Sequence, residues 1–112
     1  MKIDAGDFKA LKALYNSTNG KRWKNKTGWD FTSETPPDAS EVNNWHGVTV
    51  VGSRVTKIEL NENKLSGTLP SELGNLSNLQ YLWLHGNDLS GTVPSALGPV
   101  PRAQRGASLR IS

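Results

Sequence analysis

Apolar residues recur in the second half of the chain with a period of 24 residues. When residues 55–76 are placed over residues 79–100, ten of the 22 positions are identical. Within each copy, apolar residues alternate with polar or aromatic ones, as at Ile58 and Leu60 in the first copy. This alternation predicts a short strand with one buried face. Repeats of this length are typical of solenoids, so we expect the two strands to stack in parallel.

The segment after each predicted strand contains a turn and a return path. Asn63 and Asn87 lie where the chain turns, and their amides are suited to pair with buried backbone groups there. Leu65 begins a row of leucines on the first return path. Gly67 permits a positive φ, and Pro70 favours an extended or turn conformation, so we expect no α-helix in this segment.

Both copies contain LSGT, then Leu or Val, then Pro, and the first copy reads LSGTLPSELGNLSNL. This stretch resembles the plant-type leucine-rich repeat family, whose repeats carry L-S-G-x-[IVL]-P after the strand. The resemblance implies an α/β fold: a short leucine-rich repeat solenoid with parallel strands on its concave face and irregular return arms. Solenoids of that family recognise proteins and peptides, and many members are receptor-like kinases, inhibitor proteins or multidomain signalling proteins.

The first half of the chain is expected to cap one end of the solenoid. Leu11 and Leu14 lie at helical spacing, and we expect Asp7 to cap that helix. A single amphipathic helix must cover something, and the open end of the first repeat is the candidate. Gly52 and Ser53 separate two β-rich stretches and predict a hairpin. The segments ALKALYNSTNGKRWKNKTGW and NNWHGVTV resemble the N-terminal cap of the same family.

These patterns divide the chain into three expected parts. A capping segment occupies residues 1–54, and two repeats occupy residues 55–100, with units at 55–78 and 79–102. Residues 101–112 form a basic tail. Trp23, Trp29 and Trp45 are the largest apolar residues of the cap, so we expect them in its core.

The tail does not continue the repeat at the same period. A third unit would need apolar residues at 103, 106 and 108, where the chain has Ala103, Gly106 and Ser108. We therefore expect residues 101–112 to be disordered. The apolar edge of the second repeat would then be uncapped, which favours self-association through that edge.

The exposed positions of the two predicted strands form the candidate binding surface. The alternation places six residues on the concave face: Lys57, Glu59, Asn61, Tyr81, Trp83 and His85. Exposed Tyr and Trp residues are frequent anchors of interfaces, so the expected partner is a protein or peptide. The alternative is that Trp83 packs on Glu59 and only fills space on the sheet.

The composition argues against several other chemistries. Cysteine is absent, which excludes disulfides and thiolate sites. His46 and His85 lie on different elements, and no nucleophile-elbow sequence accompanies them. No His, Asp and Glu residues have metal-ligand spacing. We therefore expect no catalytic site, no cofactor and no metal.

The charge distribution does not favour nucleic acid as a partner. The formal net charge is +3, and the basic excess lies at the two ends of the chain. Lys21, Arg22, Lys24 and Lys26 surround Trp23, which is one arrangement that contacts nucleic acid. A solvated loop with Trp23 turned inward is the alternative, and we favour it because phosphate binding usually recruits more cations.

No segment predicts a membrane helix. No stretch approaches the ~20 apolar residues that such a helix needs, and residues 1–8 lack the apolar core of a signal peptide. The location is expected to be cytoplasmic if Met1 is the true start and extracellular if an upstream leader is missing. Sequons begin at Asn16, Asn25 and Asn75 and matter only in a secreted chain.

Two further functions stay open. The resemblance implies that the chain could be the recognition part of a larger signalling protein, such as a receptor-like kinase or a repeat-containing GTPase. The other function is a glycan- or ice-binding surface, because Thr68 and Thr92 recur at the 24-residue period.

Overall fold

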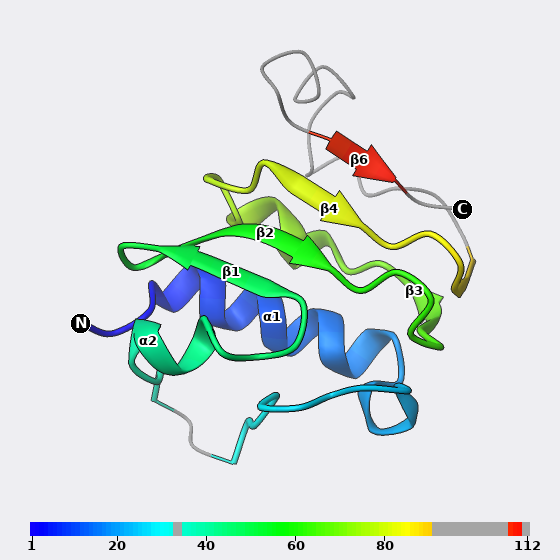
Figure 1. The fold of residues 1–112 in the computed structure, drawn as a ribbon, viewed down its shortest axis with the longest axis horizontal. Coiled ribbons are helices and arrows are strands. Elements are labelled where there is room, and N and C mark those ends of the chain that lie inside the picture. The colour runs from blue at the N-terminus through cyan, green and yellow to red at the C-terminus, as the bar shows by residue number, and fades with distance from the viewer. Residues whose placement is uncertain (33–34, 91–107, 111–112) are drawn as a thin grey trace.

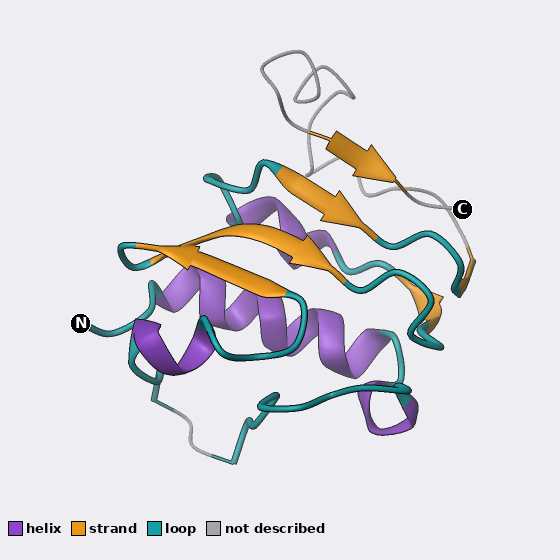
Figure 2. Ribbon diagram, viewed as in Figure 1, coloured by secondary structure: helices purple, strands orange, loops and turns teal. Residues whose placement is uncertain are grey.

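The computed structural model describes residues 1–32, 35–90 and 108–110, which form a cap followed by stacked repeat strands (Figure 1). The main sheet has the strand order β1-β2-β4-β6, and a second sheet pairs β3 with β5. The strands are β1 (Val48–Val51), β2 (Arg54–Glu59), β3 (Ser66–Thr68), β4 (Tyr81–Trp83), β5 (Asp88–Ser90) and β6 (Ser108–Arg110). The helices are α1 (Ala5–Ser17) and α2 (Ala39–Val42), with 3-10 turns η1 (Gly20–Arg22) and η2 (Ser71–Asn75). This mixture of elements, drawn by type in Figure 2, confirms the predicted α/β solenoid.

Helix α1 is capped by a different residue from the one expected. The carboxylate of Asp4 accepts a hydrogen bond from the backbone N–H of Asp7 at 3.1 Å, so Asp4 is the N-cap. The prediction for Asp7 was wrong because Asp7 lies inside the first turn and its buried carboxylate binds Arg54. As expected, α1 covers the first repeat, since it packs against η2 on the return path.

Tryptophan side chains form much of the core of the cap. Trp23, Trp29 and Trp45 are each at most 6% exposed, which confirms the prediction. The ring centroids of Trp23 and Trp29 lie 4.7 Å apart in an edge-to-face contact, and those of Trp29 and Trp45 lie 5.3 Å apart. The indole N–H groups of Trp23 and Trp29 donate to the carbonyl oxygens of Thr18 and His46. These buried donors are therefore satisfied.

The main sheet joins the cap to the repeats. Strands β1 and β2 form the predicted antiparallel hairpin around Gly52 and Ser53. Strand β2 then pairs in parallel with β4, and Ile58 lies opposite Leu82. Because the paired residues are 24 positions apart in the sequence, apolar residues at the same phase of the repeat meet in one core. The predicted inward residues are all buried: Ile58, Leu60, Leu82 and Leu84.

The return path carries a second sheet that the sequence pattern did not predict. Strands β3 and β5 pair in parallel, with Gly67 opposite Leu89. Each strand has only three residues, so their pairing depends on the stacking of the repeats more than on local propensity. Gly67 has a φ of 95°, and an added Cβ would lie 2.5 Å from the carbonyl oxygen of Ser17. Between β3 and β4 the only helical element is the 3-10 turn η2, so the expectation of no α-helix there is confirmed.

Strand β6 corrects the prediction for the tail. It pairs in parallel with β4, and Leu109 lies opposite Leu82. Disorder was therefore wrongly expected for residues 108–110, while the other tail residues lie outside the described part of the chain. The step from Leu82 to Leu109 is 27 residues, against 24 from Ile58 to Leu82, so the search for a third unit used the wrong phase. Strand β4 is paired on both sides, so it is not the edge strand of the sheet. The edge at which self-association was expected is therefore that of β6.

Candidate binding surface of the parallel sheet

Four of the six predicted surface residues lie side by side on β2 and β4. The register pairs Lys57 with Tyr81 and Glu59 with Trp83. Both pairs alternate with buried residues, so all four side chains point away from the core. Glu59 is exposed, while Lys57, Tyr81 and Trp83 are half-buried. Figure 1 shows the two strands running together across the middle of the sheet.

Tyr81 contacts two of its neighbours on this surface. The ammonium group of Lys57 lies 5.0 Å from the centroid of the Tyr81 ring, which is a cation–π contact. The rings of Tyr81 and Trp83 meet edge-on, with centroids 5.9 Å apart and planes at 83°. These contacts restrict the three side chains in the free protein, which would lower the entropic cost of ordering them against a ligand.

The other two predicted residues, Asn61 and His85, follow the strands. Both are half-buried, and the backbone N–H of Glu62 donates to the carbonyl oxygen of His85 at 2.9 Å. The structure therefore places them in adjacent turns. The Nδ1 atom of His85 is buried and has no hydrogen-bond partner among the described residues. A buried polar atom without a hydrogen-bond partner destabilises the folded protein.

Two asparagines fix the turns beside the surface, as predicted. The side-chain oxygen of Asn87 accepts hydrogen bonds from the backbone N–H groups of Asn63 at 2.8 Å and Leu65 at 3.0 Å. The Asn87 amide also donates to the carbonyl oxygen of Leu60 at 2.9 Å. Asn63 bonds the cap in the same way, through the backbone N–H and carbonyl of Asn25. Each turn is therefore tied to the layer before it, which fixes the register of the strands.

Strand β1 adds a residue that the sequence analysis missed. Thr49 pairs with Lys57 across the hairpin, so the two side chains lie on the same side of the sheet. Counting outward from the two-residue turn would instead place Thr49 opposite Thr56. A bulge between Thr49 and Val50 shifts the register by one residue. Because the sequence carries no clear signal for this bulge, Thr49 could not have been assigned to the surface in advance.

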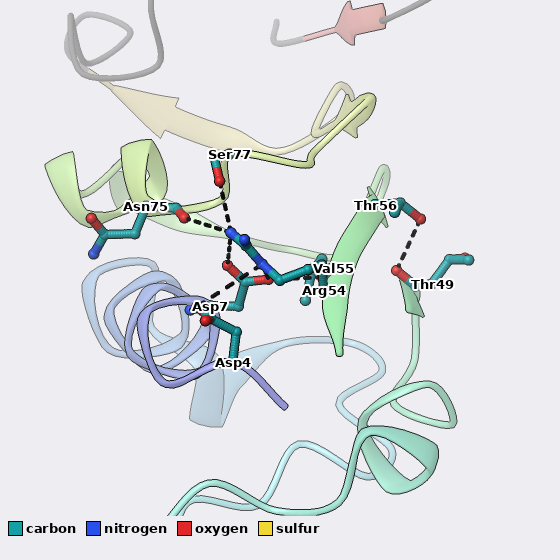
Figure 3. A network of polar contacts seen from close by, with 8 residues as sticks. All are labelled: Asp4, Asp7, Thr49, Arg54, Val55, Thr56, Asn75 and Ser77. Atoms are coloured by element: carbon teal, nitrogen blue, oxygen red, sulfur yellow. Dashed lines mark hydrogen bonds and ion pairs between the residues drawn. The ribbon is translucent and has the colours of Figure 1, made fainter. Parts of the chain in front are cut away.

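A partly buried ion pair connects α1 to the start of β2 (Figure 3). The guanidinium of Arg54 donates from Nε and Nη2 to the Asp7 carboxylate at 3.0 and 3.1 Å. Arg54 also donates to the hydroxyl of Ser77 at 2.7 Å, and the backbone N–H of Val55 donates to Asp7 at 2.8 Å. The hydrogen bonds to Asp7 raise the pKa of Arg54. This network holds the strand that carries Lys57 and Glu59.

The chemistry available on the surface is that of recognition. It presents two aromatic rings, one cation, one carboxylate, and amide and imidazole groups. The described residues contain no group of three or more His, Cys, Asp or Glu that could hold a metal ion. In that part of the chain, no helix has the length and apolar character needed to span a membrane.

Comparison with known proteins identifies the repeats. The Leucine Rich Repeat family profile matches residues 54–76 and 78–100. A probable leucine-rich repeat receptor-like protein kinase of Arabidopsis thaliana is 39% identical over 86 residues. The match covers 74% of this chain but only 8% of that kinase.

Solved structures show the same fold. The BIR2 ectodomain from Arabidopsis thaliana superimposes with a TM-score of 0.74 at 28% identity, over 100% of this chain and 56% of that one. A plant ice-binding protein superimposes with a TM-score of 0.72 at 22% identity, over 100% of this chain and 34% of that one. At 22% identity, the second likeness concerns the fold alone. The chain belongs to the plant-type leucine-rich repeat family, which confirms the resemblance, and the ectodomain fold of this family is generally non-catalytic.

Proposed function

We propose that this chain is a non-catalytic interaction module that binds a protein or peptide through the surface of β2 and β4. The observation that carries the proposal is the pair of aromatic rings, Tyr81 and Trp83, held together on β4 away from the core. Large aromatic side chains on a surface are the usual anchors of protein interfaces. The similarity to a receptor-like kinase and to the BIR2 ectodomain supports a recognition role.

The proposed site contains Lys57, Glu59, Asn61, Tyr81, Trp83 and His85, together with Thr49 from β1. On β2, Lys57 lies beside Tyr81 and Glu59 lies beside Trp83, so both signs of charge border the rings on one side. This arrangement suits an extended segment carrying both signs of charge. The alternative is that Trp83 only packs on Glu59. The two readings differ in what the loss of the ring would do: binding falls under the proposal, and only stability changes under the alternative.

A peptide-display selection tests the proposal directly. Peptides enriched on the immobilised chain would be titrated against wild type, Trp83→Ala and the control Lys9→Ala, which is exposed on α1. We expect Trp83→Ala to weaken binding by about 2 kcal/mol or more, with an unchanged melting temperature, while Lys9→Ala binds like wild type. Equal binding by all three proteins, or failure to enrich any peptide, would contradict the proposal.

We also infer that the module belongs to a larger signalling protein of the receptor-like kinase type. The support is the Arabidopsis thaliana relative, of which the chain matches only 8%. A kinase relative favours this reading over a repeat-containing GTPase. Full-length transcript sequencing tests it, because a kinase domain in the same reading frame supports the inference and a complete transcript that encodes none overturns it.

The ice-binding alternative has less support. Thr68 is exposed on β3, but Thr92, its expected partner in a periodic row, lies outside the described residues. The plant ice-binding protein is 22% identical to the chain and so supports only the fold.

A further inference from the structure

Five cations lie on two chain segments, outside β2 and β4, that hydrogen bonds join to one another. Four of them, Lys21, Arg22, Lys24 and Lys26, lie in η1 and the loop after it, and the fifth is Lys64 in the turn after β2. Two segments about 40 residues apart in the sequence thus contribute to one charged region. We call these five residues the basic surface. All five side chains are exposed.

One backbone hydrogen bond and two bonds of the Asn63 side chain hold the two segments together. The N–H of Lys24 donates to the carbonyl oxygen of Asn63 at 3.0 Å. The N–H of Asn25 donates to the side-chain oxygen of Asn63 at 2.7 Å, and the Asn63 amide donates back to the Asn25 carbonyl at 2.8 Å. Because Lys64 directly follows Asn63, it is fixed beside the lysines of the cap loop.

These cations have no acidic partners within the described part of the chain. Its ion pairs join Met1 to Asp38 and Arg54 to Asp4 and Asp7. Lys26 does donate to a backbone oxygen, that of Lys21, at 3.0 Å. The region therefore carries positive charge that no ion pair with a described acidic side chain neutralises, which favours an anionic ligand.

A hollow of about 230 Å³ adjoins the basic surface. It is lined by Tyr15, Asn16, Asn19, Gly20, Lys21 and Arg22. Its wall therefore combines an aromatic ring, two side-chain amides and two cations. The Asn19 amide already donates to the hydroxyl of Ser66 at 2.7 Å, and the Asn16 amide can bond hydroxyl groups of a ligand. The cations can pair with a carboxylate or sulfate. A hollow of this size holds a single sugar ring rather than a larger ligand.

The composition of the surface argues against two other classes of polyanion. Protein interfaces are depleted in lysine and centre on apolar anchors, whereas the large apolar residue of this loop, Trp23, is only 5% exposed. The Trp23 ring is buried against Trp29, and its indole N–H donates to the carbonyl oxygen of Thr18 at 3.1 Å, so the ring is not available to stack on a nucleic-acid base. We propose that the basic surface binds an acidic polysaccharide, with one sugar ring in the hollow beside Tyr15 and its carboxylate or sulfate groups on the lysines. This function is separate from peptide binding by β2 and β4.

The experiment uses the whole chain produced in bacteria, so that the sequon at Asn16 carries no glycan. Binding would be measured at about 50 mM salt to polygalacturonate, heparin, neutral dextran, poly-glutamate and a DNA duplex. The test variant is Lys21→Gln, Lys24→Gln and Lys64→Asn, since Asn tolerates the positive φ of residue 64. The matched control, Lys2→Gln, Lys9→Gln and Lys12→Gln, removes the same charge elsewhere. Asn16→Ala probes the hollow, and Trp83→Ala probes the concave face.

We expect polygalacturonate or heparin to bind. Tighter binding of polygalacturonate would identify carboxylate as the recognised group, and tighter binding of heparin would identify sulfate. The test variant should lose at least tenfold in affinity and show a weaker salt dependence, while the matched control loses less than threefold. Asn16→Ala should weaken binding, and Trp83→Ala should leave it unchanged, which separates this site from the peptide site. The proposal is overturned if neither polysaccharide binds, if both lysine variants lose affinity equally, or if DNA or poly-glutamate binds as tightly as the polysaccharides.

Discussion

Asp7 in the first turn of α1 and Arg54 at the start of β2 form a bidentate ion pair, although they are 47 residues apart in the sequence. The Asp7 carboxylate is fully buried, and it also accepts the backbone N–H of Val55. A carboxylate with three hydrogen bonds is held in one position. This pair therefore sets how the cap sits on the first repeat, and hence where the binding surface begins.

Replacing Asp7 by Ala should destabilise the protein by about 2–3 kcal/mol, because Arg54 loses two charge-assisted hydrogen bonds and the buried N–H of Val55 loses its acceptor. Urea unfolding followed by tryptophan fluorescence measures the change. Asp88→Ala serves as control, since Asp88 is an exposed acid whose loss should leave the unfolding midpoint in place. Equal midpoints for Asp7→Ala and wild type would show that the pair contributes nothing to stability.

Trp45→Ala should cost about 3–5 kcal/mol, because the ring is 6% exposed and its loss leaves a cavity against Trp29 and Phe31. That is a large part of the stability of a domain of this size. The comparison is Val51→Ala, at a side chain that is 66% exposed, where we expect a change below about 0.5 kcal/mol. The melting temperatures of both variants are compared with that of wild type. If Trp45→Ala melts at the wild-type temperature, the Trp45 side chain does not contribute to the stability of the core.

Much of the fold and the site was predictable because the repeat carries its own register. The 24-residue step from Lys57 to Tyr81 already pairs the two residues, and their observed register is the same. Asn63 and Asn87 lie at one phase, so a single structural role explains both. A residue type that recurs at the same position of each repeat is better evidence for a structural role than a single residue is.

The parts that were missed depend on contacts between distant segments or on loop lengths. The sequence pattern assigned the helix cap to Asp7, whereas Asp4 is the cap and Asp7 instead contacts Arg54, 47 residues further along the chain. Leu109 lies 27 residues after Leu82 instead of 24, so a search at constant period passes over it. The basic surface likewise requires Lys64 to lie beside the cap loop, which only the hydrogen bonds of Asn63 reveal.

Acid should weaken the attachment of the N-terminus to α2. Hydrogen bonds from the N-terminal ammonium and from Ser40 lower the pKa of Asp38 in the folded protein. A carboxyl with a lower pKa when folded stabilises the protein above its ordinary pKa of about 3.9, and this contribution is lost as the pH falls below that value. The urea midpoints of wild type and Asp38→Asn should therefore differ at pH 6 and converge towards pH 2. A difference that is constant with pH would mean that the charge of Asp38 is not responsible.

Strand β6 should protect the edge of the sheet. It pairs with β4 along Tyr81, Leu82 and Trp83, so a chain ending at residue 107 would leave the backbone N–H and C=O groups on that side of β4 unpaired. An open strand edge is a template for pairing with another chain. We expect the truncated chain to associate at concentrations where the full chain does not, as light scattering over a hundredfold dilution would show. Arg110→Ala is the control, because it keeps the backbone of β6 and should behave like the full chain. If the truncated chain stays monomeric over the same dilution range, β6 does not protect an edge that associates. If the full chain associates as strongly as the truncated one, association takes place through the outer edge of β6.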